Sequence, residues 1–229
     1  MLKTKSLVAL SSRVHPGETG SSWMMKGVLD FLLSDTCEAD ALRRRFVFKL
    51  VPMINPDGVV VGNHRCSLAA TDLNRVWTTA SRKLHPTIYH QKNMMRTFAA
   101  ERELALFVDL HGHSRKQDVF MYGCDGGSDG GGGWRGCGVT GGPLPGSVGI
   151  FPGVPAGLQQ RILPRILHHT ASDLFAYESC TFRVQRGKEA TARVVCWREL
   201  GICNRCLCCC WWVQLRWSMW TFLRVCKCW

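Results

Sequence analysis

Hydrophobic and polar positions along this chain fall into blocks that predict short buried strands separated by amphipathic helices. Near-continuous apolar runs of about seven residues, bounded by polar turns, are typical of strands inside a largely parallel sheet. Strands that alternate with helices predict an α/β fold, with a mixed, mostly parallel central sheet flanked by helices. The predicted strands are 6–12, 46–52, 104–110, 119–122, 180–184 and 192–197, and the predicted helices are 21–33, 86–100 and 158–175, the last perturbed at Pro164.

Two local patterns refine this prediction. In the 21–33 helix, Ser21 or Ser22 is available as the N-cap, while Asn55-Pro56-Asp57-Gly58 has the composition of a tight turn. The apolar face of the 21–33 helix is predicted to comprise Trp23, Val28, Phe31 and Leu32.

Composition divides the chain into a predicted domain at 1–202 and an atypical tail at 203–229. The tail holds seven of the 13 cysteines and five of the nine tryptophans, and it has no acidic residue. Within the domain, residues 123–157 contain 15 of the 23 glycines, which indicates a flexible insertion. The tail has no zinc-finger spacing. It is interpreted as a basic aromatic membrane-surface segment or, preferably, as the product of a misread splice boundary or a frameshift.

Charge favours acidic partners over other classes. The net charge is +12 with a pI near 9.3, so an acidic protein substrate would be attracted. Lys and Arg are spread along the chain rather than blocked, and nucleic acid is therefore not an expected partner. The sequence shows neither a secretory signal nor an 18-residue apolar window, so a reducing cytoplasmic location is expected, with cysteines that are not disulfide-bonded.

Candidate metal ligands follow two of the predicted strands. His15 and Glu18 lie on the turn after the 6–12 strand, and His111 ends the 104–110 strand. Because sites in open α/β sheets form outside the carboxyl ends of strands, all three side chains can reach one crevice. Two histidines and a glutamate, with a fourth position left open, form a catalytic zinc set. His113 is the alternative to His111, although two residues further on it is expected to point elsewhere.

Five motifs in a fixed order identify a resemblance to a known family. They are RVHPGET at 13–19, PMINPDGV at 52–59, GNHRCSL at 62–68, DLNR at 72–75 and DLHGHS at 109–114, and TARVVCWRELG at 191–201 adds a sixth. Together they resemble the catalytic domain of the cytosolic carboxypeptidases. This branch of the carboxypeptidase A-like zinc peptidases trims glutamates from tubulin and other proteins. The resemblance covers residues 5–122 and 158–202.

The resemblance implies one zinc ion per chain, with His15, Glu18 and His111 as its ligands. It implies that Arg65 polarises the scissile carbonyl, and that Asn74 and Arg75 grip the terminal carboxylate of acidic protein or peptide ends such as tubulin tails. The residue types suit these roles, because a guanidinium is a fixed fork of donors for a carboxylate and stabilises a developing oxyanion.

The chain departs from this family at its general base. The family uses a glutamate in a strand shortly after the segment at 191–201, and ungapped counting puts Cys209 at that position. Glu189 and Glu199 occupy other matched positions, and no Asp or Glu follows Glu199. The family's preceding β-sandwich domain and its closing strand and helix are also not found, which predicts an exposed sheet edge. A non-catalytic module that binds zinc and glutamate-ended peptides is therefore the alternative function.

Overall fold

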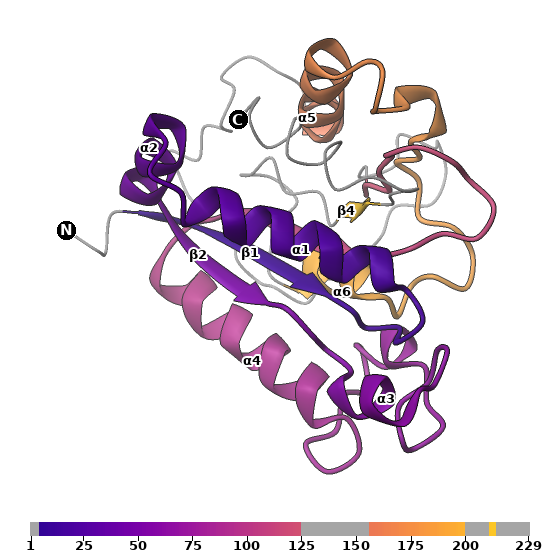
Figure 1. Ribbon diagram of the computed structural model, residues 1–229. Helices are drawn as coiled ribbons and strands as arrows, with labels where there is room; N and C mark the ends of the chain where they lie inside the picture. Colours follow the sequence, from indigo (N-terminus) through magenta and orange to yellow (C-terminus); the bar gives the residue numbers. More distant parts are fainter. Residues whose placement is uncertain (1–4, 125–155, 200–210, 214–229) are drawn as a thin grey trace.

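The computed structural model describes residues 5–124, 156–199 and 211–213 (Figure 1). Four parallel strands form one sheet in the order β2-β1-β3-β4, which confirms the predicted α/β class. β1 lies inside the sheet, paired with β2 on one side and with β3 on the other. Its buried apolar residues on both faces suit this central position. The strands are β1 (Ser6–Ser12), β2 (Phe46–Val51), β3 (Leu104–Leu110) and β4 (Trp211–Val213).

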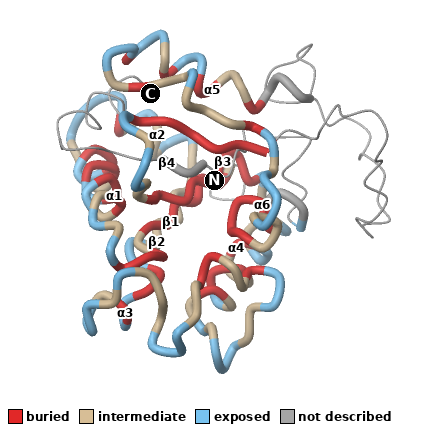
Figure 2. The backbone as a smooth tube through the Cα atoms, turned by 90° about the vertical axis from the view of Figure 1, so that its right-hand side faces the viewer, coloured by how far each residue is buried: buried red, intermediate tan, exposed pale blue. Residues whose placement is uncertain are grey.

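Helices cover both faces of this sheet (Figure 2). On one face, Val8 and Leu106 pack in a core that includes buried residues of α1 and α5. On the other face, Leu7 and Phe107 pack in a second core with α4 and α6. The helices are α1 (Thr19–Leu32), α2 (Cys37–Arg45), α3 (Pro56–Val61), α4 (Pro86–Glu101), α5 (Ala156–Thr170) and α6 (Ala192–Glu199), with short 3₁₀ turns η2 (Leu73–Arg75) and η3 (Tyr177–Ser179).

The strand predicted at 192–197 is wrong, because this segment forms helix α6. Neighbouring β-branched valines favoured a strand in the sequence. Ala192, Val195 and Cys196 have the i, i+3, i+4 spacing of one helix face, and all three are buried in the core that contains α4. Tertiary packing therefore outweighs local propensity at this position.

The strands predicted at 119–122 and 180–184 are reduced to isolated bridges. Val119 pairs with Phe175, and Tyr122 pairs with Thr181. The helix predicted at 158–175 corresponds to α5, which continues through Pro164 and ends at Thr170.

Helix α1 begins two residues before the predicted start, and neither predicted serine caps it. Glu18 occupies the N-cap position without a side-chain capping bond, while the Ser21 hydroxyl donates to the Glu18 carbonyl. Trp23, predicted to lie on the apolar face of the helix, is 55% exposed. The buried stripe consists of Met24, Met25, Val28, Phe31 and Leu32, and Trp23 lies one position outside it.

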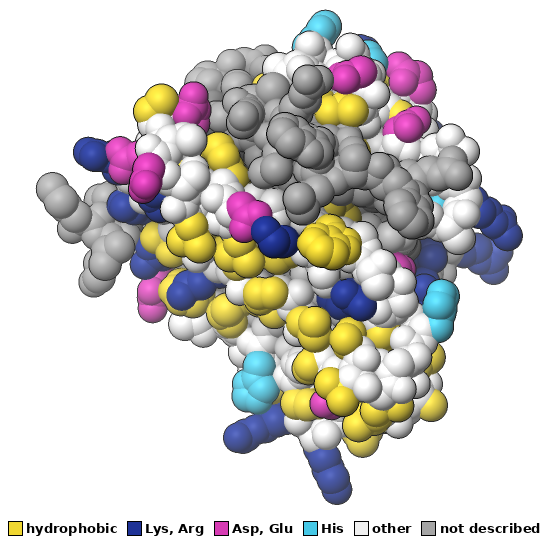
Figure 3. Space-filling view, in the orientation of Figure 1, with side chains coloured by type: hydrophobic (Ala, Val, Ile, Leu, Met, Phe, Trp, Pro, Cys, Tyr) yellow, Lys and Arg dark blue, Asp and Glu magenta, His cyan; other side chains and the backbone are white. Residues whose placement is uncertain are grey.

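The residues predicted as a turn at Asn55–Gly58 instead start helix α3. The Asn55 side chain accepts a hydrogen bond from the Gly58 N–H, and Pro56 occupies the first helical turn. Apolar side chains are exposed around this helix, where Figure 3 shows a group of hydrophobic atoms. Val60 and Val61 on α3 and Met53 just before it are among them.

The sheet edge that was predicted to be exposed is partly covered at β3. Val108–Leu110 of β3 pair in parallel with the backbone of β4, which comes from the segment predicted as an atypical tail. The glycine-rich insertion at 123–157 and the rest of the tail lie almost wholly outside the described residues. The division into a domain at 1–202 and a tail at 203–229 stays a prediction. In the part of the chain that the structure describes, no helix is long and apolar enough to cross a membrane.

Candidate metal and substrate site

The parallel pairing of β1 and β3 brings the candidate ligands together. Ser12 at the end of β1 is the register partner of Leu110 at the end of β3. The chain after each strand therefore emerges at the same edge of the sheet. His15 lies three residues beyond β1, His111 directly follows β3, and Glu18 precedes α1.

A strained residue shapes the turn that carries His15. Arg13 has a φ of 57°, a left-handed conformation that costs a non-glycine residue about 1–3 kcal/mol. Its side chain offsets part of this cost, because Nε donates to the Pro16 carbonyl at 2.7 Å and a terminal nitrogen donates to Ser22 Oγ at 2.8 Å. The arginine thus ties the turn to the first turn of α1.

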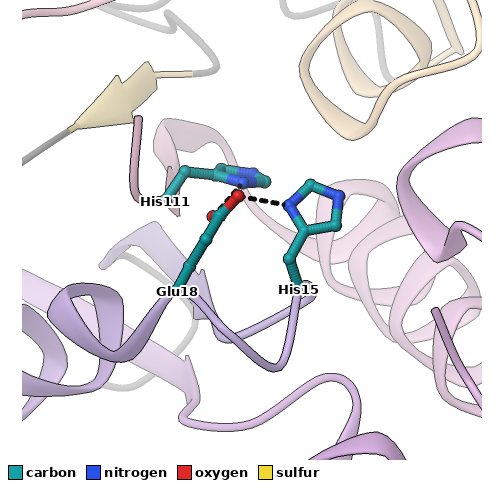
Figure 4. Close-up of side chains that lie close together, drawn as sticks. All are labelled: His15, Glu18 and His111. Carbon is teal, nitrogen blue, oxygen red and sulfur yellow. Dashed lines mark hydrogen bonds and ion pairs between the residues drawn. The ribbon is translucent and has the colours of Figure 1, made fainter. Parts of the chain in front are cut away.

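His15, Glu18 and His111 converge on one point (Figure 4). Nδ1 of His15 lies 2.7 Å from Oε1 of Glu18, and Nδ1 of His111 lies 3.1 Å from Oε2. One candidate ligand atom from each side chain lies within 4.8 Å of the others. The Gly112 N–H donates to Oε2 at 2.7 Å and fixes the carboxylate.

Each imidazole has a second carboxylate at its other nitrogen. Nε2 of His15 lies 3.1 Å from Asp72 Oδ1, and Nε2 of His111 lies 2.6 Å from Asp109 Oδ2. Carboxylates thus face both nitrogens of each ring. With a metal bound, each Nε2–H would donate to its outer carboxylate and each Nδ1 would be free to coordinate the ion. Two imidazole nitrogens and a carboxylate, oriented by outer carboxylates, form a donor set that fits zinc.

Electrostatics favour ionised carboxylates at this centre. Burial by itself would raise the pKa of Glu18, but hydrogen bonds from His111 and His15 hold that pKa well below its usual range. Burial would lower the pKa of His111, yet the charge of Asp109 and its hydrogen bond raise it to about 10. The centre therefore stabilises positive charge beside its carboxylates.

Arg65 reaches the centre through Asp72. Its Nε and a terminal nitrogen each lie 2.8 Å from Asp72 Oδ2. The loop that carries Arg65 packs tightly on the His15 turn, where the Gly17 N–H donates to the His64 carbonyl at 2.7 Å. A Cβ on Gly17 would lie 2.7 Å from the His64 ring, so only glycine permits this approach.

Asn74 lies beside His111 and is held by α6. Its Oδ1 accepts the Ala192 N–H at 2.9 Å, and its Nδ2 is 3.5 Å from His111 Nε2. Arg75 lies on the same 3₁₀ turn and donates to the Asn74 carbonyl at 2.9 Å. Unlike Asn74, Arg75 does not line the pocket next to the centre in the described structure.

That pocket combines the predicted residues with several that sequence reasoning missed. Burial lowers the pKa of Lys188, and the neighbouring Arg75, Arg65 and Arg193 lower it further. Lys188 and Arg193 both line the pocket, so an anionic ligand bound there would reduce the repulsion between these cations. The pocket is lined by Asn74, Asp109, His111, His113, Tyr122, Gln185, Lys188, Thr191 and Arg193.

Asp72 and Asp109 are the main residues that sequence reasoning missed. Asp72 belonged to a quoted motif without a role. Asp109 is a lone carboxylate within an otherwise apolar strand. A charge inside such a run needs a partner, and this requirement is the signal that could have identified it.

His113 does not join the donor group of His15, Glu18 and His111 among the described residues. Its Nδ1 accepts the backbone N–H groups of Arg115 and Lys116 at 3.2 and 3.1 Å. Its ring packs edge-on against Phe120.

A glutamate suited to general-base chemistry is not found in the described part of the pocket lining. Glu199 is held by Lys92 at 2.8 Å and by Arg96, both on α4. Cys209, which ungapped counting puts at the base position, lies outside the described residues.

Comparison with known proteins decides the family. A model described as zinc carboxypeptidase matches residues 2–125, more than half of the chain. The chain belongs to the zinc carboxypeptidase family. This zinc carboxypeptidase chain is 46% identical over 200 residues to cytosolic carboxypeptidase 3 of Mus musculus and 48% identical over 207 residues to cytosolic carboxypeptidase 1 of Homo sapiens. Each match covers 87% of this chain, but only 18% and 15% of those relatives.

Solved structures show the same fold. A metallo-carboxypeptidase from Burkholderia cenocepacia has a TM-score of 0.70 at 19% identity, with 98% of this chain and 55% of that chain covered. A metallo-carboxypeptidase from Pseudomonas aeruginosa has a TM-score of 0.69 at 21% identity with the same coverage. The fold of this zinc carboxypeptidase thus agrees with the sequence resemblance.

Proposed function

We propose that this chain is a cytoplasmic, zinc-dependent metallocarboxypeptidase domain that removes C-terminal glutamate residues from proteins such as tubulin. The observation that carries the proposal is the convergence of His15, Glu18 and His111 beside a pocket bordered by cations. The names of the cytosolic carboxypeptidase relatives support the class of activity and the location.

In this proposal, His15, Glu18 and His111 hold one zinc ion per chain. Zinc supplies a Lewis acid that polarises a carbonyl and lowers the pKa of water. Asp72 and Asp109 orient the two imidazoles from behind.

Asn74 and Arg75 bind the terminal carboxylate of the substrate. The Asn74 side chain already faces the pocket, and the Arg75 guanidinium lies next to it. Lys188 and Arg193 line the same pocket, which suits a second carboxylate on the terminal side chain. Together these cations favour glutamate over neutral side chains.

Arg65 donates to the oxygen of the scissile carbonyl as negative charge develops there. This contact uses the second edge of the guanidinium, because Nε and one terminal nitrogen are already held by Asp72. A cation aimed at the developing charge stabilises the transition state more than the ground state.

In this proposal the chain lacks the family's general-base glutamate, and this lack limits the rate. Loss of a general base typically costs about 10²–10⁴-fold, so slow turnover is expected. A second candidate function, a non-catalytic module that binds zinc and glutamate-ended peptides, is favoured by the absence of a glutamate from the described pocket lining.

One experiment separates the two functions. The purified chain is loaded with zinc and incubated with a synthetic peptide ending in Glu-Glu, while binding is measured by calorimetry and free glutamate by mass spectrometry. Slow release that disappears in Arg65→Ala supports the enzyme. Binding without release supports the module, and neither binding nor release would refute both.

A further inference from the structure

A buried carboxylate is held between two strands directly behind the proposed zinc site. Asp109 on β3 and Ser11 on β1 are register partners, and both are buried. The Ser11 hydroxyl donates to Asp109 Oδ1 at 2.7 Å. Burying an unpaired carboxylate costs several kcal/mol, so a charge at this position requires partners of this kind.

The other oxygen of Asp109 is committed to His111. Oδ2 lies 2.6 Å from His111 Nε2, and the Nδ1 of that ring faces Glu18. The hydroxyl of Ser11 has one proton and gives it to Oδ1, which fixes the carboxylate plane and leaves Oδ2 for the imidazole. Ser11, Asp109 and His111 thus form one chain of hydrogen bonds that starts inside the sheet.

The two outer carboxylates of the centre are not equivalent. Asp72, behind His15, is divided between that ring, the Asn74 N–H and the Arg65 guanidinium. Asp109 is more deeply buried, and its observed hydrogen bonds go to a neutral hydroxyl and to one imidazole. Its charge is therefore directed at His111 rather than shared with a cation.

We propose that Asp109 is a positioning residue, supported by Ser11, that fixes the tautomer and ring orientation of His111 and thereby sets the zinc affinity of the site. This inference rests on the proposed zinc site. A purely structural role for the pair would affect folding stability but not metal affinity.

The test compares the full chain with Asp109→Asn, Ser11→Ala and Ser12→Ala, using zinc titration against a chelating dye. Ser12 is the matched control, because it is the next residue on β1, is equally buried and donates to the Pro52 carbonyl instead of to Asp109. Removing an outer-shell partner typically weakens metal binding about 10–100-fold, which is expected for Asp109→Asn. Ser11→Ala shifts the Kd in the same direction by less, and Ser12→Ala leaves it unchanged.

A spectroscopic readout follows the same chain of hydrogen bonds. In the zinc-loaded protein, the His111 Nε2–H gives a slowly exchanging proton signal in ¹⁵N-edited spectra. That signal shifts and exchanges faster in Asp109→Asn and Ser11→Ala, but not in Ser12→Ala. If Asp109→Asn does not fold, the comparison of the two serine variants decides.

The outcomes separate this inference from the proposed function. Zinc binding by the wild type with an unchanged Kd in Ser11→Ala and Asp109→Asn overturns the positioning role and leaves the zinc site standing. A folded wild-type chain that binds no zinc overturns both.

Discussion

The Arg65 guanidinium and the Asp72 carboxylate form an ion pair that connects the proposed substrate-binding residues with the proposed metal ligands. Both contacts of the Arg65 guanidinium go to one oxygen of Asp72, whose other oxygen faces His15. The arginine proposed to polarise the substrate and an imidazole proposed to bind metal therefore share a carboxylate. The guanidinium keeps a second edge for a substrate oxygen while this pair holds it in place.

Arg65→Ala is expected to lower glutamate release about 10²–10³-fold, because the donor to the developing oxyanion is lost. Its zinc content should stay at the wild-type level, since Arg65 is not a ligand. Steady-state release assays on zinc-loaded protein measure the first effect and metal analysis the second. Arg44→Ala, which removes an exposed ion pair with Asp40 on α2, is the control and should behave like the wild type. An Arg65→Ala variant with unchanged release would exclude the role.

Gly17→Ala is expected to destabilise the chain by about 1–3 kcal/mol, because the new Cβ overlaps the His64 ring and carbonyl. The same displacement moves the loop that carries Arg65, so peptide binding weakens as well. Urea unfolding and calorimetry measure the two effects.

Gly62→Ala is the comparison for this variant. It adds a Cβ where nothing lies within 4 Å, at a φ of +84°, so only backbone strain is expected and peptide binding is retained. Equal peptide affinities for the two glycine variants would contradict the close-approach explanation.

Lys188→Gln is expected to weaken binding of glutamate-ended peptides about 10-fold or more, because a charged hydrogen bond to the substrate carboxylate contributes about 1.5–3 kcal/mol. Lys188→Arg keeps the charge and should keep most of the affinity. A peptide with a C-terminal Gln in place of Glu serves as the matched ligand. The wild-type preference for Glu over Gln should shrink in Lys188→Gln and should fall with added salt. A preference unaffected by this variant would remove Lys188 from substrate recognition.

Cys180 is expected to resist alkylation near neutral pH. Burial raises the pKa of its thiol to about 11, against which the Met121 N–H hydrogen bond acts only in part. Because the thiolate is the nucleophile, the rate should rise about tenfold per pH unit until the pH nears that pKa. Peptide mapping after iodoacetamide treatment compares the labelling rate of Cys180 with that of the exposed Cys37. Cys180 labelling as fast as Cys37 at pH 8 would show that the partly buried thiol does not have a raised pKa.

The apolar blocks of the sequence located the centre of the fold well. β1, β2, β3 and α4 agree with the predicted ranges to within a residue, because each is a continuous or strongly periodic buried segment. His15, Glu18 and His111 meet because the carboxyl ends of neighbouring parallel strands lie at one edge of the sheet. Their role as ligands stays a prediction.

Other features depend on contacts that a linear pattern does not contain. α6 looked like a strand because Val194 and Val195 are β-branched, whereas its helical form follows from packing with α4. The charge of Asp109 within an apolar strand signals that it needs a partner, but the sequence does not say which, because Ser11 lies 98 residues away on another strand.

Zinc content of the purified, folded full chain tests the central claim most directly. Metal analysis after zinc loading and dialysis should give about one zinc per wild-type chain, held by three protein ligands. The content should be lost in His15→Ala and in His111→Ala, and retained in His113→Ala, whose ring lies outside the donor group. A folded wild-type chain that contains no zinc would contradict the account. Full zinc content in both the His15→Ala and the His111→Ala variants would contradict it as well.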